Sequence, residues 1–293
     1  MGIYIADDAR YSSMQYCRCG NSGLQLPRFS LGLWHNFGKY GDFSNMTELC
    51  RTAFDSGITH FDLANNYGPD PGFAEENFGR ILNSDLKPYR DELIITTKAG
   101  YDMWPGPYGS WGSRKHLIAS VEQSLLRMRC EYVDIVYHHR MDKNTPLEES
   151  MGALADLVRA GKALYVGISN YDQPAMERAV QILRELRCPC IVNQRRYSLF
   201  DRTIEQDGVK ASAQANEVGI VAFSPLAQGL LSDKYLHGIP SRSRIATDSR
   251  FLQASSLTEQ RLAQIAALNE LAFARGQTLP QMALAWVLKD SVC

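Results

Sequence analysis

The sequence lacks a long apolar run, and no stretch approaches the roughly 20 residues that a membrane-spanning helix needs. It also lacks an excess of charge, because 31 Lys and Arg stand against 32 Asp and Glu, for a formal net charge of -1. Such a balance gives no electrostatic reason to expect nucleic acid or an acidic membrane as a partner. Residues 1–8 have neither the basic flank nor the apolar core of a secretory signal. We therefore expect a cytoplasmic protein.

Two familiar kinds of binding motif are missing as well. The chain contains neither G-x-G-x-x-G after an apolar run nor the P-loop pattern, so the common nucleotide fingerprints are absent. Its seven cysteines include two C-x-C pairs, at 17/19 and 188/190, but zinc sites use C-x-x-C spacing and no histidine is close in sequence to either pair. We expect reduced structural thiols and no metal site.

What the chain does contain is a regular alternation of short apolar runs and amphipathic segments. The apolar runs, which are typical of strands buried on both faces of a parallel sheet, lie at 30–34, 59–64, 93–97, 133–137, 163–168, 190–193 and 219–223. The segments with helical spacing lie at 45–56, 114–129, 145–161, 173–186, 204–216, 258–275 and 278–289. Repeated strand–helix units without a linker favour a single (β/α) barrel over a doubly wound sheet.

The two ends of this barrel differ. Residues 14–30 hold a Gly-Asn-Ser-Gly turn between two short runs and predict a hairpin that closes the bottom of the barrel. An eighth strand would begin only where the sequence stops. The expected fold is an α/β fold, a (β/α)8 TIM barrel with an N-terminal β-hairpin that lacks the eighth strand and final helix. Residues 1–293 would form a single domain, truncated at its C-terminus.

Polar residues gather where three consecutive runs end. They are Asp62, Tyr67, Lys98, His138 and His139. The carboxyl ends of barrel strands converge on one face, so these side chains are expected to meet. An ammonium beside a phenol lowers the phenol pKa, a carboxylate keeps the ammonium charged, and an imidazole can orient a carbonyl or pass on a proton. Such a phenol is suited to giving a proton to a carbonyl oxygen as a hydride reaches the carbon.

Each of these residues alone has a structural explanation. Asp62 can cap a strand end, Lys98 can be a solvated strand end, and Tyr67 can pack a turn before Gly68. The spacing by itself does not choose between the two adjacent histidines. It is the occurrence of the group at three consecutive strand ends that favours a proton-transfer site.

The chain resembles the aldo-keto reductase family over nearly its whole length. The stretches that carry the resemblance are GITHFDLANNYG at 57–68, EENFG at 75–79, KALYVGISN at 162–170 and FSPLAQGLL at 223–231. Within the family the chain is most similar to the bacterial L-glyceraldehyde 3-phosphate reductases and the potassium-channel β-subunits. The resemblance implies NADPH-dependent reduction of small aldehydes, such as L-glyceraldehyde 3-phosphate or methylglyoxal, to alcohols.

The resemblance also assigns a catalytic tetrad. Tyr67 would be the general acid, and Lys98, held by Asp62, would lower its pKa. His139 would orient the carbonyl, and His138, one residue earlier, should point away from it.

Cofactor and substrate residues follow from the same resemblance. The resemblance implies that the nicotinamide amide of NADP(H) is held by Ser169, Asn170 and Gln194, and that the nicotinamide ring stacks on Phe223. The loop implied to hold the pyrophosphate contains Ser224, Leu226, Gln228 and Gly229. The residues implied to bind phosphates are Lys234 and Arg244. Two cations there favour NADPH over NADH, because a 2′-phosphate needs them. The aromatic wall of the substrate pocket would consist of Trp34, Tyr101 and Trp104, although packing at the barrel rim explains these rings nearly as well.

Two departures from the family pattern leave alternatives open. Arg195 stands where the relatives usually have Pro, and the part of the relatives that holds the adenosine 2′-phosphate is missing. The chain could therefore be a cofactor-binding regulatory subunit like the channel β-subunits, or an inactive truncated form. His139 argues against the regulatory subunit, since Asn is expected there in those proteins. The sequence does not decide the oligomeric state and leaves a homo-oligomer open.

Overall fold

The computed structural model describes residues 3–68, 70–248, 250–290 and 292. The chain divides into two compact units. The first unit comprises Met1–Asn193 and Ser212–Gly219, and the second comprises Gln194–Ala211 and Ile220–Cys293. That residues 1–293 form a single barrel domain, as expected from the sequence, stays a prediction.

An antiparallel hairpin opens the first unit, as predicted. Strands β1 (Tyr16–Arg18) and β2 (Gln25–Pro27) pair with Cys17 opposite Leu26. The turn between them contains Gly20 in a left-handed conformation, with φ +55°. A Cβ there would lie 2.7 Å from the carbonyl oxygen of Ile191, so the close approach of this backbone requires glycine. The hairpin thus packs at the start of β8, where the strands begin.

A sheet of seven strands follows, in the order β3-β4-β5-β6-β7-β8-β9. Its strands are β3 (Leu31–Gly32), β4 (His60–Asp62), β5 (Ile94–Ala99), β6 (Val133–His138), β7 (Ala163–Ser169), β8 (Cys190–Arg196) and β9 (Gly219–Phe223). All seven predicted strands are present, and the pairs from β3–β4 to β6–β7 are parallel. Every residue of β4 and of β6 is buried, as the uninterrupted apolar runs indicated.

The register of the sheet brings the predicted strand-end residues together. Asp62 lies opposite Thr96, and Lys98 lies opposite Tyr137 on the next strand. Lys98 belongs to β5 itself, one residue before its end, rather than following the strand. The carboxyl ends of β4, β5 and β6 therefore share one edge of the sheet.

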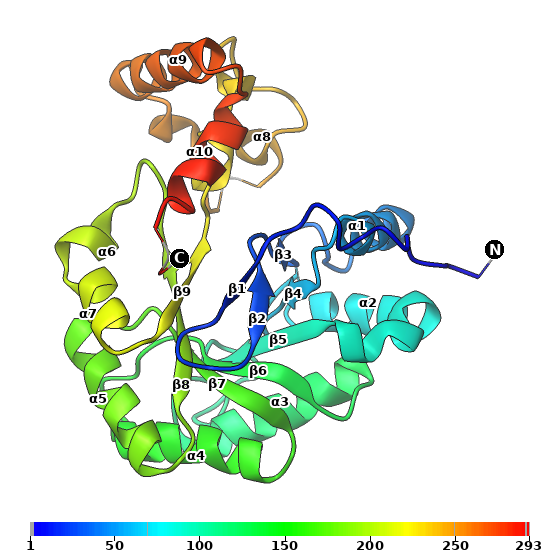
Figure 1. Cartoon of the computed structure of the whole chain (residues 1–293), viewed down its shortest axis with the longest axis vertical. Coiled ribbons are helices and arrows are strands. Elements are labelled where there is room, and N and C mark those ends of the chain that lie inside the picture. The colour runs from blue at the N-terminus through cyan, green and yellow to red at the C-terminus, as the bar shows by residue number, and fades with distance from the viewer. Residues whose placement is uncertain (1–2, 69, 249, 291, 293) are drawn as a thin grey trace. The chain divides into compact units, whose positions relative to one another are not determined.

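Helices alternate with these strands in the first unit. They are α1 (Phe43–Asp55), α2 (Phe73–Ile81), α3 (Arg114–Met128), α4 (Leu147–Arg159) and α5 (Gln173–Glu185). A π-helical turn (Leu82–Leu86) and a 3-10 segment (Lys87–Glu92) continue α2 toward β5. Helices α3 and α4 pack on β5, β6 and β7, and Figure 1 shows α2 to α5 along the strands of this unit.

Two helical predictions need correction. Helix α2 was not predicted; it is short and begins after Gly72, whose φ of +91° and lack of a side chain leave no capping signal in the sequence. The segment 204–216 was predicted as one helix but forms two, α6 (Thr203–Gln206) and α7 (Val209–Ala215). The interruption falls at Gly208, which has a positive φ of 82° that a helix cannot contain.

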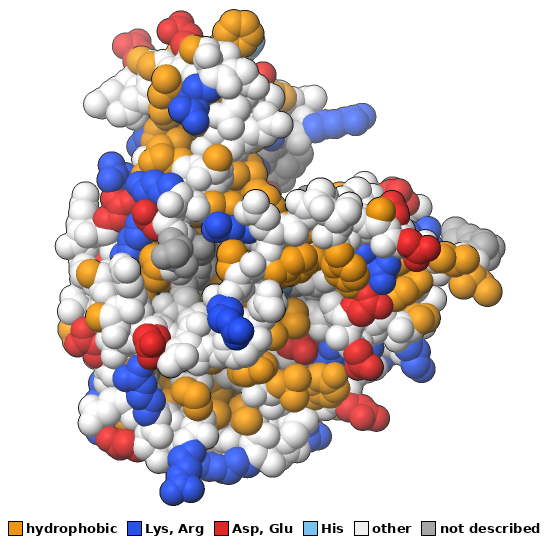
Figure 2. Space-filling model, in the orientation of Figure 1, with side chains coloured by type: hydrophobic (Ala, Val, Ile, Leu, Met, Phe, Trp, Pro, Cys, Tyr) orange, Lys and Arg blue, Asp and Glu red, His pale blue; other side chains and the backbone are white. Residues whose placement is uncertain are grey.

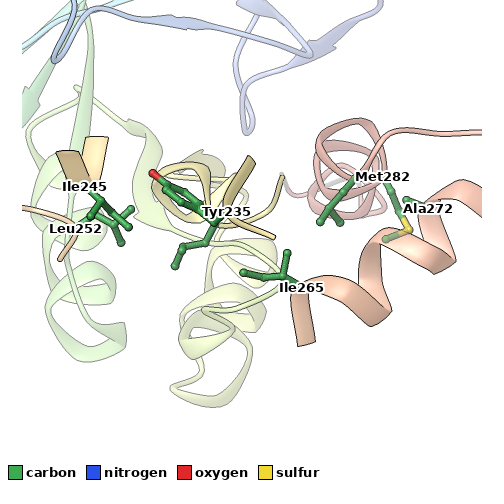
Figure 3. Packing of buried hydrophobic residues seen from close by; sticks show 8 residues of the cluster. Tyr235, Ile245, Leu252, Ile265, Ala272 and Met282 are labelled. Atoms are coloured by element: carbon green, nitrogen blue, oxygen red, sulfur yellow. The ribbon is translucent and has the colours of Figure 1, made fainter. Parts of the chain in front are cut away.

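The second unit has a small apolar core of its own. Short turns η3 (Ala227–Gly229), η4 (Asp233–Tyr235), α8 (Arg244–Thr247) and η5 (Ala254–Ser256) precede α9 (Glu259–Ala274) and α10 (Leu279–Val287). Figure 3 shows Tyr235, Ile245, Leu252, Ile265 and Met282 converging between these elements. Helix α10 starts with a capping box, in which the side chains of Thr278 and Gln281 each accept from the other's backbone N–H. The apolar core and the cap explain why this segment folds as helix.

The described residues contain no eighth strand in this sheet, as predicted. After α10, the carbonyl oxygen of Val292 accepts a hydrogen bond of 2.7 Å from the backbone N–H of Ile220 in β9. This bond is of the kind that a neighbouring strand would make.

Charges of both signs are scattered over the face of the molecule that Figure 2 shows, rather than gathered by sign. This distribution agrees with the net charge of -1. None of the described helices is both long enough and apolar enough to cross a membrane.

Close packing inside the first unit makes a stability prediction. A Cβ on Gly167 of β7 would lie 2.6 Å from the ring of Tyr137 and 2.8 Å from Val192, whereas a Cβ on Gly152 of α4 would meet nothing within 4 Å. Gly167→Ala should lower the free energy of unfolding by about 1–3 kcal/mol through overpacking. Gly152→Ala should raise it by about 0.5–1 kcal/mol through helix propensity. Urea denaturation of both variants measures the difference, and equal effects of the two substitutions would contradict the packing described for β7.

Candidate active site

Lys98 is the centre of the predicted site and is fully buried. Its ammonium donates three hydrogen bonds, to Asp62 Oδ2 at 2.7 Å, to the carbonyl oxygen of Leu63 at 2.7 Å and to Tyr67 Oη at 3.2 Å. An ammonium has three N–H donors, so all of them are used. The side chain is therefore held in one place, with one N–H pointing at the phenol oxygen.

Asp62 balances the charge of Lys98. Its other oxygen, Oδ1, accepts from Thr96 Oγ1 at 2.8 Å, and the ring of His60 lies 3.2 Å from the same hydroxyl. Burial would raise the pKa of Asp62, but Lys98 outweighs it and the pKa is lowered. Burial would likewise lower the pKa of Lys98, but Asp62 and Tyr67 raise it above its ordinary value. Both groups stay charged at neutral pH.

The phenol of Tyr67 is the third member of the group. Burial raises the pKa of Tyr67, and the ammonium of Lys98 lowers it by less, so the net shift is upward. We expected a net lowering from the sequence, and the difference arises because the ring is enclosed as well as placed beside a cation. The phenol is thus protonated at neutral pH. Because Lys98 donates to its oxygen, its own O–H remains available for another acceptor.

His139 completes the predicted tetrad. Its ring lies edge-on to Tyr67, with the ring centroids 5.8 Å apart. Burial, then Lys98, His138 and Arg140, lower the pKa of His139 well below 6.5, so the imidazole is neutral. Its Nδ1 is buried and has no hydrogen-bond partner among the described residues.

His138 lies apart from this group. Its Nδ1 is 2.6 Å from the hydroxyl of Tyr171, and burial lowers its pKa to about 4. It pairs with a buried tyrosine rather than with Tyr67 or Lys98, which agrees with the expectation that it points away from the tetrad.

Ser169 and Asn170, predicted at the nicotinamide amide, lie at the end of β7 in the same unit, Ser169 as its last residue and Asn170 directly after it. Asn170 has a left-handed backbone with φ 60°, and its Nδ2 donates to the carbonyl oxygen of His139 at 3.0 Å and to Ser169 Oγ at 3.2 Å. This conformation is costly for a residue other than glycine and recurs at ligand sites. The two polar side chains are thus linked to the backbone of the tetrad histidine.

Two of the three predicted pocket aromatics contact the tetrad. The ring centroid of Trp34 lies 6.4 Å from that of Tyr67, and the ring of Tyr101 meets His139 edge-on at 4.6 Å. Apolar rings around buried charges lower the local polarity, which strengthens the electrostatic interactions there.

The third aromatic and one unpredicted residue lie beside this wall. Trp104 packs on His116 of α3, with centroids 5.1 Å apart. Arg140 was not predicted; its guanidinium lies over Tyr101 at 4.2 Å and over Trp111 at 3.6 Å. The signal that could have found it is its position directly after His139 at the end of β6.

The remaining predicted cofactor residues belong to the second unit. Gln194 is buried in β8, and Phe223, at the end of β9, lies 5.7 Å from the guanidinium of Arg196. Arg195, the departure noted in the sequence, pairs with Asp207 at 3.1 Å. Its charge is therefore balanced within its own unit.

The loop after β9 has an unusual backbone. Ser224, Ala227, Gln228 and Gly229 all have positive φ, from 47° to 99°. For residues other than glycine this costs of order 1–3 kcal/mol each, and such strain clusters at ligand clamps. Leu226 accepts from the backbone N–H of Gly229 at 2.9 Å, which closes the loop on itself.

Two predicted cations accompany this loop. Lys234 Nζ lies 3.6 Å from the position of a Cβ on Gly229, so its side chain runs next to this loop. Arg244 Nη1 donates to Gln228 Oε1 at 3.4 Å, and Gln228 Nε2 donates to the carbonyl oxygen of Phe251 at 3.0 Å. A strained loop beside two cations has the donor chemistry of a phosphate site.

Comparison with known proteins decides the family. The model of the Aldo/keto reductase family matches residues 28–292. The chain belongs to this family. It is 56% identical over 291 residues to L-glyceraldehyde 3-phosphate reductase of Escherichia coli strain K12, covering 98% of this chain and 84% of that protein. It is 34% identical over 278 residues to a probable voltage-gated potassium channel subunit beta of Oryza sativa subsp. japonica, covering 93% and 83% of the two chains.

A solved structure agrees with this assignment. The thermostable aldo-keto reductase Tm1743, crystallised with the inhibitor epalrestat, matches with a TM-score of 0.72 and 31% identity, covering 94% of this chain and 85% of that one. The fold is therefore of the TIM-barrel type, as predicted, with seven parallel strands and the N-terminal hairpin in the described residues. The protein is an oxidoreductase of a family that uses a nicotinamide cofactor.

The cysteines form no metal site in the part of the chain that the structure describes, where no cluster of His, Cys, Asp or Glu could hold an ion. Cys19, Cys50 and Cys190 are buried, and burial raises the pKa of each thiol to about 12. Such thiols stay protonated and unreactive.

The electrostatics of the tetrad predict the titration of His139. Its imidazole should stay neutral between about pH 6 and pH 8, because burial and the Lys98 cation disfavour the charged form. The double variant Asp62→Asn/Lys98→Met removes the ion pair together, so the pKa of His139 should rise. NMR titration of the imidazole carbons measures both, with His139→Gln to assign the signal and Lys162→Met as a surface control. A transition near the ordinary pKa of 6.5 in the unaltered protein would contradict the geometry.

Proposed function

We propose that the protein reduces small aldehydes to alcohols with NADPH, and that Tyr67 delivers the proton. The observation that carries this proposal is the hydrogen bond from Lys98 to the oxygen of the Tyr67 phenol. It leaves the phenol with a proton to donate and stabilises the phenolate that donation produces.

The proposed mechanism places the substrate carbonyl oxygen between Tyr67 and His139. Neutral His139 orients that oxygen by a hydrogen bond, and the carbonyl carbon becomes more electrophilic. NADPH, when bound, would supply the hydride that the carbonyl carbon accepts. Tyr67 transfers its proton to the oxygen, which becomes the alcohol hydroxyl, and the charge left on the phenol is compensated by Lys98. Asp62, which accepts a hydrogen bond from Thr96, holds Lys98 in place throughout.

The proposed substrates are short aldehydes, such as L-glyceraldehyde 3-phosphate or methylglyoxal. The relative that is 56% identical is an L-glyceraldehyde 3-phosphate reductase, and the identity extends over nearly all of this chain. Trp34 and Tyr101, next to the tetrad, would limit the size of the aldehyde.

The residues that the family resemblance assigns to the cofactor support NADPH as the nicotinamide cofactor. Ser169, Asn170 and Gln194 would hold the nicotinamide carboxamide, which needs neutral donors and acceptors. Phe223 would stack on the nicotinamide ring. The strained loop formed by Ser224, Leu226, Gln228 and Gly229 would hold the pyrophosphate, and Lys234 and Arg244 would hold phosphates of the cofactor. Two cations there favour NADPH over NADH, because the additional 2′-phosphate needs them although the part of the relatives that usually holds it is missing.

Removing the phenol hydroxyl tests the proposed acid. In Tyr67→Phe, kcat for DL-glyceraldehyde 3-phosphate with NADPH should fall by at least about 100-fold, because general-acid catalysis is lost. NADPH affinity should not change. Loss of NADPH absorbance measures turnover, and the matched control is Tyr132→Phe, directly before β6 and so away from the carboxyl ends of the strands. Tight NADPH binding by the unaltered protein without turnover of any small aldehyde would instead favour a regulatory subunit.

Removing either cation tests the cofactor assignment. Arg244→Met and Lys234→Met should each weaken NADPH binding about 10- to 100-fold, the value of charge-assisted hydrogen bonds, and should affect NADH much less. Quenching of intrinsic fluorescence gives both affinities. Arg250→Met removes an exposed cation paired with Asp248 and serves as the control. Equal losses for the two cofactors would overturn the 2′-phosphate assignment.

A further inference from the structure

Arg140 is a cation beside the tetrad that the proposed mechanism does not use. It directly follows His139, and the ring of Tyr101 contacts both residues, at 4.6 Å from the His139 ring and 4.2 Å from the Arg140 guanidinium. Arg140 and the imidazole that would orient the carbonyl therefore both contact one aromatic ring.

The guanidinium is fixed in its orientation by its surroundings. Its Nε donates to the carbonyl oxygen of Gly100 at 2.9 Å, and Nη2 donates to Ser110 Oγ at 2.9 Å. The ring of Trp111 lies 3.6 Å away, and the backbone N–H of Trp111 bonds the same Gly100 carbonyl at 3.0 Å. Stacking on rings and two hydrogen bonds hold the plane of the fork, so little rotamer freedom remains to be lost on binding.

Part of the hydrogen-bonding capacity of Arg140 is unused. A guanidinium has five N–H donors, and among the described residues Nη1 has no hydrogen-bond acceptor. The carboxylate nearest to it, Asp102, lies 3.6 Å from Nη2 and is itself 86% exposed. An exposed carboxylate at that distance is a weak, screened partner. The side chain of Arg140 is one-fifth exposed, so an anion can reach it.

We propose that Arg140 binds the phosphate of the aldehyde substrate, which makes the protein selective for phosphorylated over neutral short aldehydes. The inference rests on the proposed function and names its substrate class. A fork with free N–H groups on one edge matches two oxygens of a phosphate. The short skeleton of a three-carbon aldehyde phosphate suits a carbonyl site and an anion site that both border the ring of Tyr101. The rigid fork discriminates by affinity, while Tyr67 and His139 act on the carbonyl.

The test compares two substrates that differ only in the phosphate. Arg140→Met should lower kcat/KM for glyceraldehyde 3-phosphate by about 10- to 100-fold and leave kcat/KM for glyceraldehyde within about twofold. Arg140→Lys keeps the charge without the fork and should lose less. Arg178→Met, a surface arginine paired with Glu148, is the control. An equal loss for both aldehydes would show that Arg140 only holds the loop in place, and would overturn the inference.

A second variant should change the selectivity in the opposite direction. Ser110, which accepts from Arg140 Nη2, donates to Asp102, and the amide oxygen of an asparagine can still accept that bond. Asp102→Asn removes the competing carboxylate and should raise kcat/KM for the phosphorylated aldehyde alone. No change, or a rise for both aldehydes, would count against an anion at Arg140.

Binding without turnover separates this inference from the proposed function. Calorimetric titration with glycerol 3-phosphate in the presence of NADP⁺ should give measurable binding that Arg140→Met weakens at least tenfold, whereas glycerol should not bind. That result would stand even if the protein turned over no aldehyde. Absence of glycerol 3-phosphate binding, or binding that Arg140→Met does not alter, would refute the phosphate site even in an active reductase.

Discussion

The ion pair between Lys98 and Asp62 is the interaction on which the rest of the site depends. Both charges are buried, and breaking such a pair by removing one partner costs about 3–5 kcal/mol, because the other charge is left without compensation. The pair is kept by bonds that use every donor of Lys98, to Asp62, Leu63 and Tyr67. One of those donors points at the oxygen of the Tyr67 phenol. The O–H of the phenol must therefore point away from Lys98, so the ion pair determines the direction in which the phenol can donate its proton.

Burial and the same pair together decide the charge of its neighbours. Burial, reinforced by the fixed cation of Lys98, lowers the pKa of His139 and keeps it neutral, and burial outweighs that cation to raise the pKa of Tyr67 and keep its proton. A carbonyl placed between Tyr67 and His139 would meet two neutral hydrogen-bonding groups. The charged pair of Lys98 and Asp62 is bonded to the first of these groups, the Tyr67 phenol. Such an arrangement stabilises negative charge that develops on oxygen and needs little reorganisation when the reaction occurs.

Much of this was predictable from the sequence, because parallel strands carry continuous apolar runs and end on a common edge. All seven strands and the meeting of Asp62, Tyr67 and Lys98 follow from that rule, and the hairpin follows from the Gly-Asn-Ser-Gly turn. Helix α2 did not, since it begins at Gly72 without a capping side chain, and the break at Gly208 depends on one backbone angle. The upward pKa shift of Tyr67 depends on how completely the ring is enclosed, which spacing does not reveal. The position of Arg140 depends on a loop whose rings, Tyr101 and Trp111, meet only in the fold.

The pH dependence of kcat/KM for NADPH-dependent glyceraldehyde 3-phosphate reduction tests the central claim most directly, after correction for ionisation of the substrate phosphate. If neutral Tyr67 is the acid and His139 is neutral, the corrected rate stays level through neutral pH and falls only at alkaline pH, when the phenol with its raised pKa ionises. A corrected rate that instead falls as pH rises through about 6.5 would mean that a protonated imidazole is the acid, and would contradict the account.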